Sequence, residues 1–182
     1  MPLVSVDVKA IPTVHTIDFS TLISDSGIIR YRVDAKVYDI YSNTEDPYWH
    51  YPDGIYVERF DSLLQVEANI VADTAYYFVR KDLWRAVDNV VVKNMEGTTF
   101  ETSELFWNPK ASPNAMDAFY TNRPVKITKI DGTVIPALNG FKADQSLSII
   151  RLLSVGKGTF MVEESADTLS QNTVSSDNKQ LP

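Results

Sequence analysis

The residues with the greatest potential for chemistry in this sequence are two histidines and 24 carboxylates, because it contains no cysteine. His15 and His50 stand far apart, and neither belongs to an HxH or HExxH pattern that would supply further zinc ligands. There is no GxSxG nucleophile motif, and the 7 glycines form no phosphate-binding loop. Glu101 and Glu104 share no strand face, and no carboxylate pair stands out as acid and base. We therefore expect no catalytic residue, no metal ligand and no cofactor; the chain is not predicted to be an enzyme.

The aromatic run Tyr48-Trp49-His50-Tyr51 allows two interpretations. Its rings can stack on a sugar or clamp a partner if a loop presents them to solvent. Alternatively, the loop folds back and its rings fill one end of the core. The first interpretation predicts a carbohydrate-binding module that uses Tyr48, Trp49 and Tyr51.

Composition restricts the partners. A net charge of −7 argues against non-specific nucleic-acid binding, which requires an excess of Lys and Arg. A hydrophobic fraction of 44% excludes a wholly disordered chain, and 182 residues suit one domain. No stretch approaches the ~20 apolar residues of a membrane helix. The opening Met1-Pro2-Leu3-Val4 lacks the basic and apolar regions of a signal peptide.

The elements that must position any functional residue are strands. Over residues 29–37, apolar and charged side chains alternate without exception, and residues 64–72 repeat the pattern. Such alternation is typical of a strand with one buried and one solvated face. Turn signals of two or three residues, such as Arg80-Lys81-Asp82, join antiparallel neighbours and are too short for parallel crossovers. The sequence predicts an all-β, antiparallel fold, a twisted jelly roll or open β-roll.

This reading divides the chain into three parts. Residues 1–26 form a partly ordered amino-terminal segment, and residues 27–162 form a single β-domain. Residues 163–182, rich in Ser, Asp, Asn and Gln, form a polar tail that we expect to be disordered.

An ordered succession of short segments resembles LptC-like proteins of the Bacteroidetes type, periplasmic components of the lipopolysaccharide exporter. The resemblance covers roughly residues 11–150. It includes residues 11–16 (IPTVHT), 22–32 (LISDSGIIRYR), 46–49 (DPYW), 52–61 (PDGIYVERFD), 72–77 (ADTAYY), 90–97 (VVVKNMEG) and 100–108 (FETSELFWN). Two features differ from the family: Asp88-Asn89 replaces Gly-Asn, and the proline-containing stretch Pro109–Pro124 replaces a shorter hairpin.

The resemblance implies a curved jelly roll of the LptA/LptC (OstA-like) type. Such proteins receive the acyl chains of lipopolysaccharide from an inner-membrane ABC transporter and pass the lipid to a periplasmic bridge protein. Edge strands would contact the transporter's periplasmic domains near the amino-terminal edge and the bridge protein around Ser148–Val155. It also implies a periplasmic location, with a membrane tether in a segment that this chain lacks. A soluble, bridge-type carrier of the same superfamily is the alternative.

An acyl-chain groove requires a continuous apolar face with room left between its side chains. The residues expected on that face alternate along the predicted strands, and several are small. They are Tyr31, Val33, Ala35, Val37, Val66, Ala68, Ile70, Ala72, Phe141 and Ala143. The same positions would also pack an ordinary sandwich core. A filled interior would favour the carbohydrate-binding module, and convergent carboxylates in a cleft would favour a hydrolase.

Overall fold

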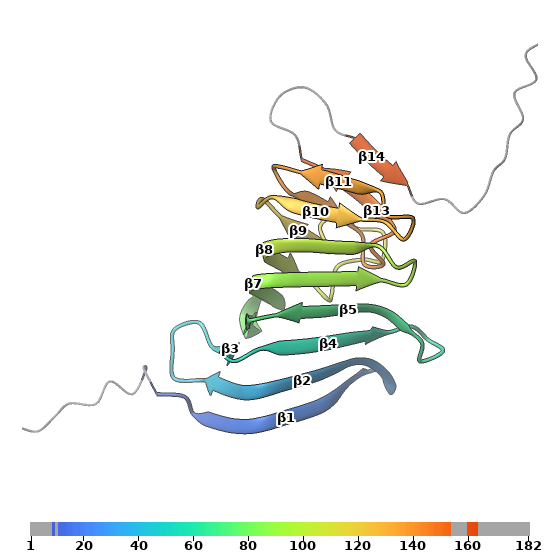
Figure 1. Cartoon of the computed structure of the whole chain (residues 1–182). Helices are drawn as coiled ribbons and strands as arrows, with labels where there is room; N and C mark the ends of the chain where they lie inside the picture. Colours follow the sequence, from blue (N-terminus) through green and yellow to red (C-terminus); the bar gives the residue numbers. More distant parts are fainter. Residues whose placement is uncertain (1–8, 10, 154–159, 164–182) are drawn as a thin grey trace, which may run out of the picture.

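Antiparallel strands make up most of the described chain. The structure, a computed structural model, describes residues 9, 11–153 and 160–163. The strands are β1 (Val14–Asp25), β2 (Ile28–Tyr41), β3 (Tyr48–Tyr51), β4 (Ile55–Phe60), β5 (Val66–Ala72), β6 (Thr74–Phe78), β7 (Leu83–Asn94), β8 (Thr99–Trp107), β9 (Phe119–Thr121), β10 (Val125–Thr128), β11 (Val134–Ala137), β12 (Phe141–Ala143), β13 (Ile149–Leu152) and β14 (Phe160–Glu163). A 3-10 turn, η2 (Val79–Lys81), connects β6 to β7, and no α-helix occurs within these ranges. The prediction of an all-β, antiparallel, jelly-roll-like fold is confirmed (Figure 1).

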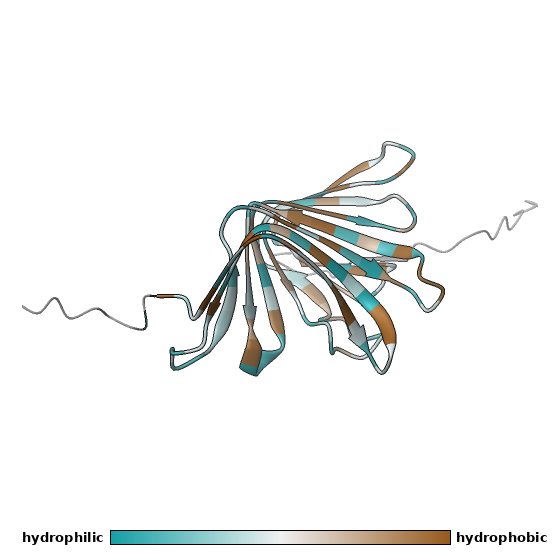
Figure 2. Cartoon of the chain, turned by 90° about the horizontal axis from the view of Figure 1, so that it is seen from below, coloured by the Kyte–Doolittle hydropathy of each residue, from teal (hydrophilic) through white to brown (hydrophobic). Residues whose placement is uncertain are grey.

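The long strands β2 and β7 each take part in two layers. β2 pairs with β4 over Tyr31–Ala35 and with β3 over Asp39–Tyr41. β7 pairs with β6 over Leu83–Val87 and then with β5 over residues 91–94. β8 likewise pairs with β10 over Thr99–Thr102 and with β9 over Phe106–Trp107. The first layer therefore contains β4, β5, β10 and β11, and the second contains β3, β6, β9, β12, β13 and β14. Figure 2 shows the two layers meeting along one edge and diverging from it.

Left-handed backbone marks this shared edge in β7. In β7 the register shifts between Val87 and Val90, and Asp88 and Asn89 between them have φ of 60° and 47°. Asp and Asn tolerate this conformation better than other non-glycine residues. The Asn89 amide donates to the Asp73 carboxylate at the neighbouring corner, with an N–O distance of 2.6 Å. The strands thus bend at corresponding positions, which creates two layers from one continuous sheet.

The first strand extends the domain toward the amino terminus. Residues 1–26 were predicted to lie outside the β-domain, yet β1 pairs with β2 from Val14 to Asp25. The alternation in β1 is hard to recognise because Asp18, with φ of 54°, interrupts it. Ile17 before this point is 64% exposed, whereas Phe19 after it packs against the core. The predicted tail beyond residue 163 lies outside the described residues.

A row of aromatic rings runs through the core between the layers. Neighbouring ring centroids along the row lie 4.4 to 6.1 Å apart. The row consists of Phe19, Tyr38, Tyr51, Trp84, Trp107 and Phe119. Beyond it, the carboxy-terminal part of the core is filled by small and large apolar side chains, including Phe141 and Ala143, which are fully buried. The interior is therefore packed at this end.

Candidate functional site: an aromatic cleft between the layers

An open cleft of about 710 Å³ lies between the two layers. Its apolar lining comes from strands of both layers and consists of Ile23, Tyr31, Val33, Trp49, Val57, Phe60, Tyr77, Trp84 and Trp107. The cleft is bordered by residues 23–25 at the end of β1, residues 60–62 at the end of β4 and the loop after β8. These strand ends lie away from the shared corner, so the cleft opens where the layers diverge.

Aromatic contacts hold the wall of the cleft formed by the second layer. The ring of Tyr77 lies 4.8 Å from that of Trp49 and 5.0 Å from that of Trp84. Tyr31 crosses from the first layer and meets Trp107 edge-on at 5.0 Å. Such ring pairs stabilise a fold by about 0.5 to 1.5 kcal/mol beyond the effect of the area they bury. The wall is therefore well packed and apolar, the kind of surface that accepts a hydrocarbon chain.

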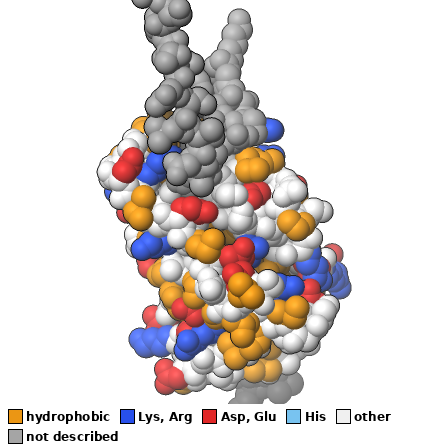
Figure 3. All heavy atoms as spheres, turned by 90° about the vertical axis from the view of Figure 1, so that its right-hand side faces the viewer, with side chains coloured by type: hydrophobic (Ala, Val, Ile, Leu, Met, Phe, Trp, Pro, Cys, Tyr) orange, Lys and Arg blue, Asp and Glu red, His pale blue; other side chains and the backbone are white. Residues whose placement is uncertain are grey.

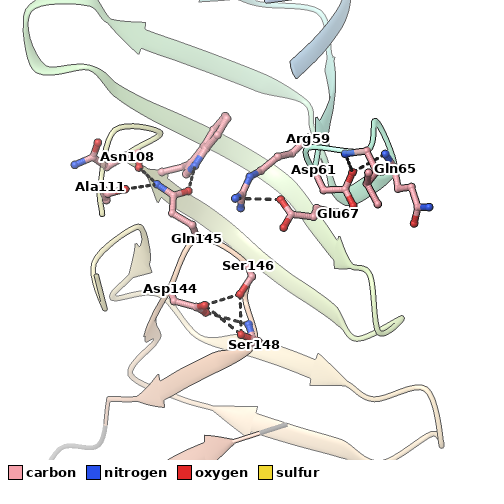
Figure 4. A network of polar contacts seen from close by, with 12 residues as sticks. Arg59, Asp61, Gln65, Glu67, Asn108, Ala111, Asp144, Gln145, Ser146 and Ser148 are labelled. Carbon is pink, nitrogen blue, oxygen red and sulfur yellow. Dashed lines mark hydrogen bonds and ion pairs between the residues drawn. The ribbon is translucent and has the colours of Figure 1, made fainter. Parts of the chain in front are cut away.

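The loop after β8 closes one side of the cleft, and the side-chain amide of Gln145 joins it to the aromatic wall. Nε2 of Gln145 donates to the main-chain oxygens of Asn108 and Ala111, at 2.7 and 3.2 Å. Oε1 of Gln145 accepts the indole N–H of Trp107 at 3.3 Å. Gln145 is 5% exposed, so these bonds satisfy a buried polar group. Figure 4 shows this amide between the loop and the aromatic wall.

The turn that carries Gln145 is organised by Asp144. The Asp144 carboxylate accepts the main-chain N–H groups of Ser148 and Ile149, at 3.0 and 2.9 Å, and hydroxyl bonds from Ser146 and Ser148. Asp144 is 4% exposed, so its carboxylate is buried within the turn. It serves as an internal acceptor for the turn and positions Gln145 at the cleft.

An ion pair provides the charged part of the cleft. Nη2 of Arg59 on β4 lies 3.1 Å from Oε2 of Glu67 on β5, and both residues line the cleft. Figure 4 shows Arg59 reaching toward the side of the cleft that carries Gln145. The site thus combines a hydrocarbon-accepting wall with polar groups at defined positions, a combination typical of binding sites for amphiphilic ligands.

The turns near the cleft expose apolar side chains to solvent. At the β4–β5 turn, Leu63 and Leu64 are 75% and 56% exposed, and Leu64 has φ of 60°. The Asp61 carboxylate fixes this turn by accepting the N–H groups of Leu63 and Gln65, at 2.7 and 2.9 Å. Figure 3 views the molecule from the side where the β1–β2, β4–β5 and β7–β8 turns lie, and shows hydrophobic groups among charges of both signs.

The residues expected to face an acyl-chain groove occupy different places. Tyr31 and Val33 line the cleft, and Ala35 packs against the core. Val37 is half-buried, because β2 changes its inward face at the corner and Tyr38 is buried instead. Val66 is 41% exposed and does not line the cleft. The remaining residues are buried: Ala68, Ile70, Ala72, Phe141 and Ala143.

The aromatic wall was missed by the sequence analysis. Each of these rings lies on a different strand, and the available signal is the alternation within each strand, which indicates an inner face for Trp49, Tyr77, Trp84 and Trp107. The run at residues 48–51 was read as part of a long loop. It forms β3, so its side chains alternate between the two faces of the layer.

This alternation separates the rings of the predicted sugar platform. Trp49 packs against the core and Tyr51 is 1% exposed. Tyr48 instead stacks on Tyr41, with 4.7 Å between ring centroids. The three rings therefore share no common surface, and one face of Tyr48 is already covered.

The histidines have structural partners. Nδ1 of His15 lies 2.6 Å from Oδ1 of Asp39, and His50 stacks on Tyr76 with 4.5 Å between centroids. Burial lowers the pKa of His50, which favours its neutral form at neutral pH. Over the described residues, no group of three or more His, Cys, Asp or Glu side chains is arranged to hold a metal ion.

The carboxylates considered for acid–base chemistry form ion pairs. Nζ of Lys126 donates to Oε2 of Glu101 at an N–O distance of 2.7 Å. Glu104 accepts from Arg85 at 2.7 Å and from Arg123 at 3.2 Å. Burial opposes ionisation of Glu104, but the two arginines lower its pKa overall. It is therefore held as a carboxylate and is unsuited to deliver a proton at neutral pH.

In the comparisons with known proteins, no family model matches the chain and no curated protein matches it either. Within the described residues, no helix is long and apolar enough to cross a membrane. The cleft and its lining remain the best-defined candidate site.

Proposed function

We propose that this chain is a periplasmic component of a lipopolysaccharide-export system that accepts acyl chains in the cleft between its layers. The observation that carries the proposal is the open cleft of about 710 Å³ with its wall of aromatic rings. The resemblance of residues 11–150 to LptC-like proteins supports it independently. No chemistry is required of the chain, because its role is to hold the lipid and pass it on.

The size of the cleft limits how much lipid it holds. At about 30 Å³ for a water-sized group, such as one methylene, the cleft has room for roughly two dozen groups. This corresponds to one or two acyl chains, fewer than a multiply acylated lipid carries. Each fully buried methylene contributes about 0.8 kcal/mol, so enclosing every chain would bind the lipid too tightly for release. Partial burial in an open cleft suits a transient carrier.

Transfer requires neighbours that continue the cleft. β1 lies at one end of the sheet and pairs with β2 alone among the described strands. An unpaired edge of this kind can accept a strand from a similarly folded partner. We propose that the transporter's periplasmic domains bind here and that a bridge protein binds at the opposite end of the sheet, beside β14. The second contact was expected around Ser148–Val155, but β13 pairs with both β12 and β14 and is therefore no edge strand. Part of the predicted second contact, residues 154–155, lies outside the described residues.

Photo-crosslinking tests the lipid-carrier proposal. p-Benzoylphenylalanine is placed at Tyr31 or Tyr77 in the cleft and, as matched controls, at Tyr48 or Tyr120 on the outer face. Glu67, which the alternating pattern places on the solvated face, is unsuitable as a control because it lines the cleft. We expect crosslinks to lipopolysaccharide from the cleft positions only. Equal labelling from both faces, or labelling from the outer face alone, would contradict the proposal.

A further inference from the structure

The charged part of the cleft carries a further inference, because its ion pair is incomplete. Arg59 and Glu67 have side chains that are 18% and 24% exposed. Their contact depends on an irregularity: the β4–β5 register shifts between Arg59 and Phe60, so that Phe60 pairs with Val66 and Arg59 with Ala68. Glu67 lies between these pairs. Arg59 follows Ile55 and Val57 on the inner face of β4 by ordinary alternation, and the shift brings Glu67 to the same face, where the alternating sequence would place Val66.

The guanidinium of Arg59 has an N–H donor that makes no hydrogen bond. Nη2 is paired with Glu67, but Nη1 is buried and finds no hydrogen-bond acceptor among the described residues. A buried, cationic N–H without an acceptor is destabilising, and such groups are rare in native proteins. Since a guanidinium presents five N–H donors in a planar fork, it matches the paired oxygens of a carboxylate or phosphate.

Of the other four charged side chains that line the cleft, three are engaged elsewhere. The Asp61 carboxylate holds the β4–β5 turn, and Nζ of Lys110 lies 2.9 Å from Oδ1 of Asp82. Asp25 accepts the Ser26 hydroxyl at 3.2 Å, and Arg30 adds a second arginine to the lining. What distinguishes Arg59 among the lining cations is that its unused donor, Nη1, is buried.

We propose that the cleft selects amphiphiles with an anionic head group, and that Arg59 donates to oxygen atoms of this head, displacing Glu67 in part. This inference rests on the proposed function only in requiring that the cleft accepts a hydrocarbon chain. The head group that Arg59 would bind is an oxyanion, either a carboxylate or a phosphate. Glu67 keeps the guanidinium partly neutralised when no ligand is present and competes with the ligand for it.

The test compares three probes by isothermal titration calorimetry on the full chain. Decyl phosphate carries both chain and anion, decanol carries the chain alone, and inorganic phosphate carries the anion alone. We expect decyl phosphate to bind at least about tenfold more tightly than decanol, as for a charge-assisted bond. Arg59→Gln should abolish this preference and leave the affinity for decanol within about twofold. Glu67→Gln should strengthen decyl phosphate binding several-fold, a change opposite in direction to any loss of folding.

Arg80→Gln is the matched control, because Arg80 forms an exposed ion pair with Asp46 outside the cleft lining. The Arg80→Gln variant should bind decyl phosphate and decanol with the affinities of the wild type. Equal affinity of the wild type for decyl phosphate and decanol would overturn the role of Arg59 and leave the lipid-carrier proposal standing. Binding of inorganic phosphate as tight as that of decyl phosphate would also overturn it, since the site would then be one for free anions. Failure of both alkyl probes to bind would overturn the carrier proposal itself.

Discussion

Trp107 donates its indole N–H to Gln145 across 38 residues of sequence, and this bond joins the aromatic wall of the cleft to the loop that closes it. The same amide bonds two carbonyls of that loop. One buried side chain therefore fixes the shape of the cleft from two directions. Its position depends on the turn built around Asp144, which contributes no surface of its own to the cleft.

Replacing Gln145 with alanine should destabilise the fold by about 2 to 4 kcal/mol. The substitution leaves the indole N–H and the Ala111 carbonyl without their partner, whereas the Asn108 carbonyl still accepts the Ala111 N–H. Each unsatisfied buried group costs about 1 to 3 kcal/mol. Urea denaturation measures the loss. Gln65→Ala, at an exposed turn position, is the control and should change stability by no more than about 0.5 kcal/mol. Similar stabilities of the two variants would show that the loop is held by other contacts.

The second prediction concerns Gly140, which lies at the corner between the layers. A Cβ there would lie 1.9 Å from the main-chain oxygen of Thr121, and φ is +85°. Gly140→Ala should cost about 3 kcal/mol or more, since neither the backbone clash nor the strain can relax cheaply. Gly132 has the same φ of +85° but open space around it, so Gly132→Ala should cost only about 1 to 2 kcal/mol. Equal melting temperatures for the two alanine variants would contradict this reading.

The fold class could be predicted from the sequence because apolar and polar side chains alternate strictly wherever a strand is straight. Val33 is buried as its alternation predicts. The prediction fails where a strand bends: after the corner in β2, Tyr38 is buried in the place expected for Val37. An inserted residue in β5 similarly brings Glu67 to the inner face and leaves Val66 exposed.

The candidate site was less predictable because its parts meet only in three dimensions. Nothing near Gln145 in the sequence indicates a bond to Trp107 or to the loop after it. Similarly, the spacing of Arg59 and Glu67 acquires meaning only once β4 and β5 pair with a shifted register. Alternation identifies inner faces, but it does not indicate which inner-face positions are packed and which border open space.

Stability should decrease in alkaline solution through Tyr77. Burial, together with the hydrogen bond that its hydroxyl donates to Asp82 at 2.8 Å, raises the pKa of Tyr77 to about 12. A raised pKa in the folded state means that folding favours the protonated hydroxyl. The contribution of Tyr77 to the free energy of unfolding is therefore complete below about pH 10, the pKa of tyrosine in the unfolded chain, and is lost as the pH rises toward 12. Urea denaturation across this window should show a smaller decrease for Tyr77→Phe than for the wild type. Parallel curves would contradict the assignment.

Trp84 should limit the length of chain that the cleft accepts. Behind it lies a small cavity of about 20 Å³, and Val57, Trp84 and Trp107 border both spaces. Trp84→Leu should connect them, so that tetradecanol gains affinity relative to decanol by about fivefold, because further methylenes become buried. Phe106→Leu removes a ring that stacks on Tyr120 on the outer face and should leave this ratio unchanged. A folded Trp84→Leu variant with the wild-type ratio would show that the cavity does not extend the cleft.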